Sequence, residues 1–132
     1  MTVVLGTDLT SSVVEASTRI YHQRGHKAFG SDLATAVEAY TPTEAAPHFA
    51  EVAVVRVPAI PRVEAILHPN ADPALLAAGF AALVEAGWEV WVVIPATRMG
   101  IGHTALRGLG VVLQQWWCDG NGTVYFGTPE VP

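Results

Sequence analysis

The sequence has few charged residues, one cysteine and no long uninterrupted apolar segment. Charged side chains make up 14% of its 132 residues, whereas about a quarter is usual in globular proteins. No window approaches the roughly 18 apolar residues of a membrane span, and the N-terminal segment lacks the basic and apolar regions of a secretory signal. A lone Cys118 cannot form an internal disulfide. These absences predict a cytoplasmic protein with no membrane partner.

Positive charge is scarce and scattered as well. Seven Lys and Arg residues stand against 12 acidic residues, which gives a net charge of -5. Proteins that bind nucleic acid concentrate their basic residues on one face to neutralise phosphates. We therefore expect no nucleic-acid partner. Cys118 follows two tryptophans, and we interpret it as a packed small hydrophobe rather than a nucleophile.

Apolar residues, by contrast, make up 51% of the chain. The length predicts one α/β domain over residues 1–132 with a substantial core. The helix expected at residues 74–86 has a single charge, Glu85, and is apolar nearly all round, which is typical of a helix buried on more than one side. Obligate subunit interfaces resemble a domain core. We therefore expect a homo-oligomer or a complex with a protein partner.

Strand and helix patterns alternate along the first part of the chain. Residues 3–6 predict a buried strand, and the Ser12–Glu15 capping box predicts the start of a helix that ends at Gly25. The segment "HKAFGSD" predicts a second strand, followed by a helix from about Ser31 to Tyr40. This strand–helix–"GH"–strand opening is similar to that of many Rossmann-like domains. The expected fold is a three-layer Rossmann-like α/β sandwich with a largely parallel sheet.

The middle of the chain contains further strand patterns. Apolar runs at 52–57 and 63–67 are separated by Pro58–Pro61, and the prolines argue against regular pairing. The runs form either a kinked hairpin or two strands in different places. Arg56 would be costly unpaired in such a run, so we expect Glu51, Glu64 or a neighbouring subunit to pair with it. The run "EVWVVIP" is apolar on both faces, which predicts a central parallel strand.

The C-terminal segment admits two interpretations. A helix could continue to Trp117 if it tolerated Gly108 and Gly110, at about 1 kcal/mol each. Alternatively the helix ends at Gly108, "VVLQQWW" is a strand, and "CDGNG" turns it back into "TVYFG". We expect the β-hairpin.

Ligands of open α/β sheets bind beyond the carboxyl ends of parallel strands. This rule points to three loops, at residues 6–12, 30–32 and 96–103. The first and third open predicted helices, whose N-terminal N–H groups favour anions, and a guanidinium in the third can bind phosphate bidentately. The candidate ligand-binding residues are Thr7, Asp8, Thr10, Ser11, Asp32, Arg98, His103 and Arg107.

Each candidate also has a structural interpretation. The hydroxyl residues of the first loop are ordinary helix starts, Asp8 can hold its own turn, and Asp32 can cap a helix. His103 and Arg107 are expected to share a helix face. This face either binds an anion with both side chains or is an ordinary solvent-exposed surface. The glycines at 100 and 102 can serve either a ligand or tight packing, and we favour packing.

Recognisable catalytic and cofactor motifs are missing. There is no G-x-G-x-x-G, Walker loop, G-x-S-x-G or H-E-x-x-H, so no catalytic residue is assigned and no cofactor is expected. His22 and His26 have metal-ligand spacing, but Gly25 should end the helix between them, so no metal is expected.

The leading hypothesis is a non-enzymatic module that acts by self-association or by binding a protein partner. Two observations support this hypothesis: the high proportion of apolar residues, and the expected exposure of Trp116 and Trp117. The alternative is a domain that binds a nucleotide or another phosphorylated small molecule at the three loops.

Overall fold

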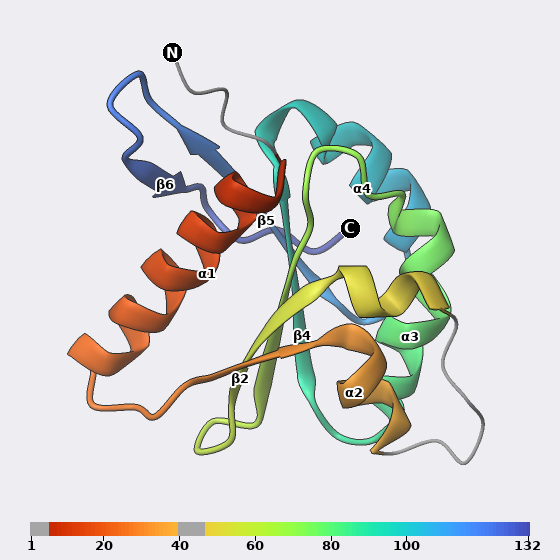
Figure 1. Ribbon diagram of the computed structural model, residues 1–132. Helices are drawn as coiled ribbons and strands as arrows, with labels where there is room; N and C mark the ends of the chain where they lie inside the picture. The colour runs from red at the N-terminus through yellow and green to blue at the C-terminus, as the bar shows by residue number, and fades with distance from the viewer. Residues whose placement is uncertain (1–5, 40–46) are drawn as a thin grey trace.

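A computed structural model describes residues 6–39 and 47–132, with only the backbone described at residues 6–9 and 47 (Figure 1). Six strands pair in chain order into one open sheet. They are β1 (Phe29–Asp32), β2 (Ala53–Val57), β3 (Arg62–Ile66), β4 (Glu89–Pro95), β5 (Val112–Cys118) and β6 (Val124–Phe126). The helices are α1 (Gly6–Gln23), α2 (Leu33–Glu38), α3 (Pro73–Glu85) and α4 (Met99–Leu106), with short 3-10 turns η1 (Pro47–Glu51) and η2 (Ala96–Arg98). The α/β class is confirmed.

The sheet is mixed. The sequence had suggested a largely parallel sheet, and this expectation is not confirmed. Only β3–β4 and β4–β5 pair in parallel, and the other three neighbouring pairs are antiparallel. Parallel neighbours need a long crossover connection, and here α3 and α4 supply the two that exist. The prediction of a central parallel strand at β4 is confirmed, whereas the expected Rossmann-like arrangement is not.

Helices cover the two faces of the sheet unequally. One core cluster lies between the sheet and α2, η1, α3 and α4, and a second lies between the sheet and α1. Figure 1 shows α1 standing on one side of the sheet and α2, α3 and α4 on the other. Three layers were expected, and three layers are present.

Helix α1 begins earlier than its sequence pattern indicated. Residues 3–5 of the expected first strand lie outside the described residues, and Gly6 is already helical. Ser12 and Glu15 are therefore inside the helix and do not form an N-terminal capping box. The predicted end of the helix is confirmed, since Gly25 has a φ of 80°. The His26 N–H donates to the Tyr21 carbonyl at 2.9 Å, which is a Schellman-type closure.

The apolar runs on either side of the proline segment form a regular hairpin. Strands β2 and β3 pair from Ala53↔Ile66 to Val57↔Arg62, so the prolines do not prevent pairing. They occupy the turn at residues 58–61, where no ladder hydrogen bond needs their missing N–H. The expected pairing of Arg56 with Glu64 is wrong, because the two lie on opposite faces of this hairpin. Arg56 makes none of the ion pairs found in the described residues, and its Nε is buried without a hydrogen-bond partner.

The predicted C-terminal hairpin is confirmed. Strand β5 pairs with β6 through Trp116↔Phe126 and Cys118↔Val124. The Asp119 carboxylate accepts hydrogen bonds from two backbone N–H groups of the turn, at 2.8 and 3.0 Å. The two tryptophans were both expected to be exposed, and this is wrong for Trp116 and confirmed for Trp117. Trp116 is buried, and its indole N–H donates to the Leu67 carbonyl at 3.1 Å, whereas the neighbouring Trp117 is 41% exposed.

The two glycines at the start of α4 have different roles. Gly102 is buried, and a Cβ on it would lie 3.2 Å from both Cδ atoms of Leu113 and 3.3 Å from Cδ1 of Ile94. A Cβ on Gly100 would meet nothing within 4 Å. Gly102 therefore lets α4 pack closely on the sheet, which supports the packing interpretation of this loop.

Substituting the two glycines should separate packing from helix propensity. We expect Gly102→Val to lower the free energy of unfolding by about 1–3 kcal/mol, because the added methyl groups enter a filled core. The matched control Gly100→Val has space and a small gain in helix propensity, so its stability should be unchanged or slightly higher. Urea unfolding of both variants measures this. Equal stability of the two variants would show that α4 does not pack as described.

Candidate functional site

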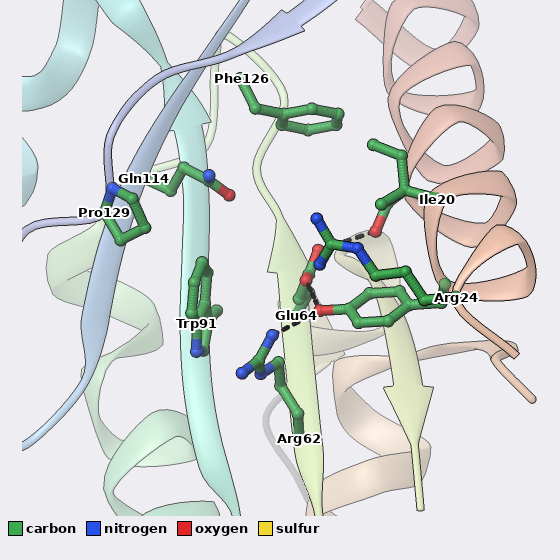
Figure 2. Close-up of a pocket in the computed structure, with 10 residues that line it drawn as sticks. Ile20, Arg24, Arg62, Glu64, Trp91, Gln114, Phe126 and Pro129 are labelled. Atoms are coloured by element: carbon green, nitrogen blue, oxygen red, sulfur yellow. Dashed lines mark hydrogen bonds between the residues drawn. The ribbon is translucent and has the colours of Figure 1, made fainter. Parts of the chain in front are cut away.

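A cavity of about 300 Å³ lies between α1 and the sheet. It forms beside α1, which is the one helix on this face among the described residues, while the chain after β6 continues along the edge of β5, where Glu130 exchanges backbone hydrogen bonds with Leu113. Figure 2 shows the cavity and its lining side chains, which come from α1 and the residue after it, from strands β3, β4, β5 and β6, and from the C-terminal segment. The lining residues are Ser17, Ile20, Tyr21, Arg24, Arg62, Glu64, Trp91, Gln114, Phe126 and Pro129.

A buried carboxylate lies in the wall of this cavity that the sheet provides. Alternation along β3 points Glu64 toward α1, and it is 5% exposed. The Ser17 hydroxyl donates to its Oε1 at 2.8 Å, and the Tyr21 hydroxyl donates to its Oε2. Both donors lie on the buried stripe of α1, one helical turn apart. Each oxygen of the buried carboxylate therefore has a hydrogen-bond donor, as a buried charge requires.

Arg62 is held at the edge of the same network. Its Nη1 donates to the Tyr21 hydroxyl at 3.0 Å, and its Nη2 lies 3.4 Å from an oxygen of Glu89. The guanidinium stacks over the Trp91 ring at 4.3 Å from the centroid, and the indole N–H of that ring donates to Glu89 at 2.9 Å. Arg62, Trp91 and Glu89 thus fix one another at the amino-terminal ends of the strands.

This packing changes the proton affinity of the tyrosine. Burial, and next the charge and hydrogen bond of Glu64, raise the pKa of Tyr21 well above that of free tyrosine. Burial alone would lower the pKa of Arg62, but its hydrogen bond to Tyr21 and the nearby negative charges raise it overall. The phenol is therefore neutral and the guanidinium charged around neutral pH.

The remaining walls combine apolar surface with two polar groups. Ile20, Phe126 and Pro129 supply the apolar part. The Gln114 amide donates to the Gly127 carbonyl at 2.9 Å, which fixes its orientation. Arg24 is exposed at the end of α1, and Figure 2 shows its side chain extending from the helix over the cavity. The cavity therefore reaches solvent on the side of Arg24.

The residues expected to bind a ligand are not gathered at this cavity. Thr7 and Asp8 lie in the first turns of α1, and their side chains are outside the described part. Thr10 is buried on the same helix and Ser11 is exposed. Asp32 caps α2, since its carboxylate accepts the Thr35 N–H at 2.8 Å.

The other predicted residues lie on the opposite face, around α4. The Arg98 Nη1 donates to the Pro69 carbonyl at 3.1 Å, and His103 Nε2 lies 3.1 Å from a Glu130 oxygen. Arg107 is the C-cap residue directly after α4, where the chain turns away with a ψ of 129°, and a shared role with His103 stays a prediction. The helix starts of α1 and α4 are separated by the sheet, and β1 lies three strand positions from β4. An anion site at Arg98 stays a prediction.

The network around Glu64 was missed by sequence reasoning. A signal was available, because Glu64 is the one charged residue within the apolar run 63–67. Ser17 was a second signal, because it interrupts the apolar stripe of α1 at a buried position. Two polar residues at core positions of two different elements are candidates for a buried pair.

Comparisons with known proteins leave the site as the main guide to function. No protein family model, curated protein or solved structure matches this chain. Within residues 6–39 and 47–132, no helix is long and apolar enough to cross a membrane, and no group of three or more His, Cys, Asp or Glu side chains could hold a metal ion.

The pKa of Cys118 supports its interpretation as a packed residue. Burial, with a further contribution from the charge of Asp119, raises the pKa of the thiol. Less thiolate is then available at neutral pH, and the thiolate is the nucleophile.

The raised pKa of Tyr21 predicts a loss of stability at alkaline pH. Above the ordinary value of 10.0 the unfolded chain ionises this phenol while the folded protein keeps its proton. The stabilisation is fully present below that pH and is lost as the pH rises, by up to about 1.4 kcal/mol per pH unit. Urea unfolding below and above this pH should show a steeper loss in the wild type than in Tyr21→Phe. Identical losses would contradict the described environment of Tyr21.

Proposed function

We propose that this protein binds a small organic molecule in the cavity between α1 and the sheet. The observation that carries the proposal is the polar network of Ser17, Tyr21 and Glu64, which is buried in the apolar contact between α1 and the sheet and also lines the cavity. A cavity with apolar and aromatic walls and a few fixed polar groups has the composition of a ligand site.

Stability alone does not account for this network. Burying a carboxylate costs several kcal/mol, and replacing a buried charged network by apolar side chains of similar volume is often neutral or stabilising. The neighbouring residues of this core cluster, among them Val13, Val55 and Ile66, are apolar and fully buried. An apolar residue at position 64 would continue their pattern. A polar wall for a ligand is a role that an apolar residue at position 64 could not fill.

Ligand-observed and protein-observed NMR can test the proposal with a fragment library of neutral, cationic and anionic compounds. We expect binding fragments to shift the indole N–H resonance of Trp91 and the backbone N–H resonances of Ile20, Gln114 and Phe126. The indole of Trp117, exposed on the other face of β5, should stay unchanged. Fragments that bind only elsewhere, or no fragment shifting the cavity resonances, would contradict the proposal.

A combined variant provides the control for stability. Ser17→Ala, Tyr21→Phe and Glu64→Leu together remove the polar network without leaving a partner unsatisfied among the three. We expect the triple variant to fold with similar or higher stability and to bind the same fragments with an affinity changed by at least about tenfold, because the polar wall of the cavity is gone. Unchanged affinity in a folded triple variant would show that the network has no part in binding.

We also propose self-association through the outer surface of α3 and α4, with a second copy of this chain as the partner. Leu75 is 61% exposed and Ile101 is 48% exposed, and a shallow hollow lies between the two helices, lined by Ala74, Gly100, Ile101, Thr104 and Ala105, with the carboxylate of Asp72 at its margin. Glu85 is the one Asp, Glu, Lys or Arg side chain within either helix. In a symmetric dimer each residue near the axis meets its own copy, so an uncharged surface avoids like-charge repulsion.

The oligomeric state tests this second proposal. We expect light scattering at micromolar concentration to give at least twice the chain mass of 14.0 kDa. Leu75→Glu should restore the monomer, because two copies of the introduced charge would be buried against each other. The matched variant Glu85→Gln, near the other end of α3, should remain associated. A monomeric wild type would overturn the proposal.

A further inference from the structure

We infer that the ligand of this cavity is a small organic monoanion, a carboxylate on a flat apolar body, held by the guanidinium of Arg24. The inference rests on the proposed function and adds the chemical class of the ligand. It derives from the charges that line the cavity, from the hydrogen bonds already made there, and from the nature of the apolar walls.

The negative charge in the lining is already satisfied. Glu64 receives one hydroxyl donor on each oxygen and is almost fully buried. The lining also contains two guanidinium groups, those of Arg24 and Arg62. The lining side chains alone therefore carry a net charge of one positive, which Glu89, outside the lining, partly offsets at Arg62. A ligand with one negative charge neutralises this excess, whereas a cationic ligand would add to it.

The two arginines differ in how much of their binding capacity is used. Arg62 donates to Tyr21, approaches Glu89 and stacks on Trp91, yet its buried Nε has no hydrogen-bond partner. Arg24 makes none of the ion pairs found among the described residues. Arg19, on the same helix, does have an acidic neighbour, Glu15 at 3.3 Å. The Arg24 guanidinium is therefore available for a carboxylate, which it can bind with two parallel hydrogen bonds.

The apolar walls favour a flat body of limited size. Trp91 and Phe126 come from two strands, and Ile20 and Pro129 complete the apolar surface. A volume of about 300 Å³ is at the lower end of the range for small-molecule sites, which suits a ligand of one or two rings. Gln114 lines the cavity as well, and one of the two N–H groups of its amide donates to the Gly127 carbonyl. Its oxygen remains as an acceptor for a donor group on the ligand.

Three compounds of one shape and different charge test the inference. Naphthoate, naphthamide and naphthylmethylamine present an anion, a neutral amide and a cation on the same ring system. Titrations followed at the Trp91 indole N–H resonance should show that naphthoate binds at least about tenfold more tightly than naphthamide, equivalent to about 1.4 kcal/mol. The amine should bind most weakly.

Variants assign the charge preference to one residue. We expect Arg24→Gln to reduce the affinity for naphthoate far more than the affinity for naphthamide, so that the two affinities become similar. The matched control Arg19→Gln removes an equal charge from the same helix away from the cavity, and it should change neither affinity. Arg24 lies on the surface, so its substitution should leave folding intact.

The possible results separate the inference from the proposed function. If naphthamide or the amine binds in the cavity as tightly as naphthoate, the protein binds small molecules there but the anion inference is wrong. If Arg24→Gln weakens all three compounds equally, or Arg19→Gln acts as strongly as Arg24→Gln, the assignment to Arg24 is wrong. If none of the three shifts the cavity resonances while other fragments of the library do, the inference is wrong and the proposed function stands; if no fragment of any kind shifts them, both are contradicted.

Discussion

The handedness of crossover connections between parallel strands determines how the rest of this structure is arranged. Strands β3, β4 and β5 follow one another in the same direction across the sheet, and each step is made through a helix. Right-handed crossovers that advance in one direction place their helices on the same face. Helices α3 and α4 therefore lie together, and among the described helices α1 alone covers the other face. One helix cannot cover six strands, and the uncovered area beside it is where the cavity forms.

The contact between α1 and the sheet depends on polar as well as apolar groups. Val13 packs against the sheet in the ordinary way, but Ser17 and Tyr21 dock onto the same face through the Glu64 carboxylate. Hydrogen bonds to a carboxylate are directional. They therefore restrict the rotation of α1 about its axis and its position on the sheet more than contacts between methyl groups would. The same contact positions Tyr21 to accept a hydrogen bond from Arg62. The arrangement that orients α1 also shapes the wall of the cavity.

Local chemistry could be predicted from the sequence, and the relations between distant elements could not. The helix cap at Asp32, the closing glycine at Gly25 and the hairpin turn after Cys118 each depend on residues that are neighbours in the chain. The direction of the strands depends on how hairpins and crossovers combine. The meeting of Ser17 with Glu64 depends on which face α1 covers, so a sequence pattern shows two isolated polar residues and not a pair.

The order of the strands in the sheet is the order of the strands in the chain, and this has a consequence for folding. Each strand pairs with its immediate neighbours in sequence, so the sheet can grow outward from the β3–β4 pair without opening strands that have already paired. The cavity, however, is bounded by α1 at one end of the described chain and by Phe126 and Pro129 at the other. Both ends must dock before its walls exist. A ligand that requires those walls would stabilise only the completed fold, and its binding would report that folding has finished.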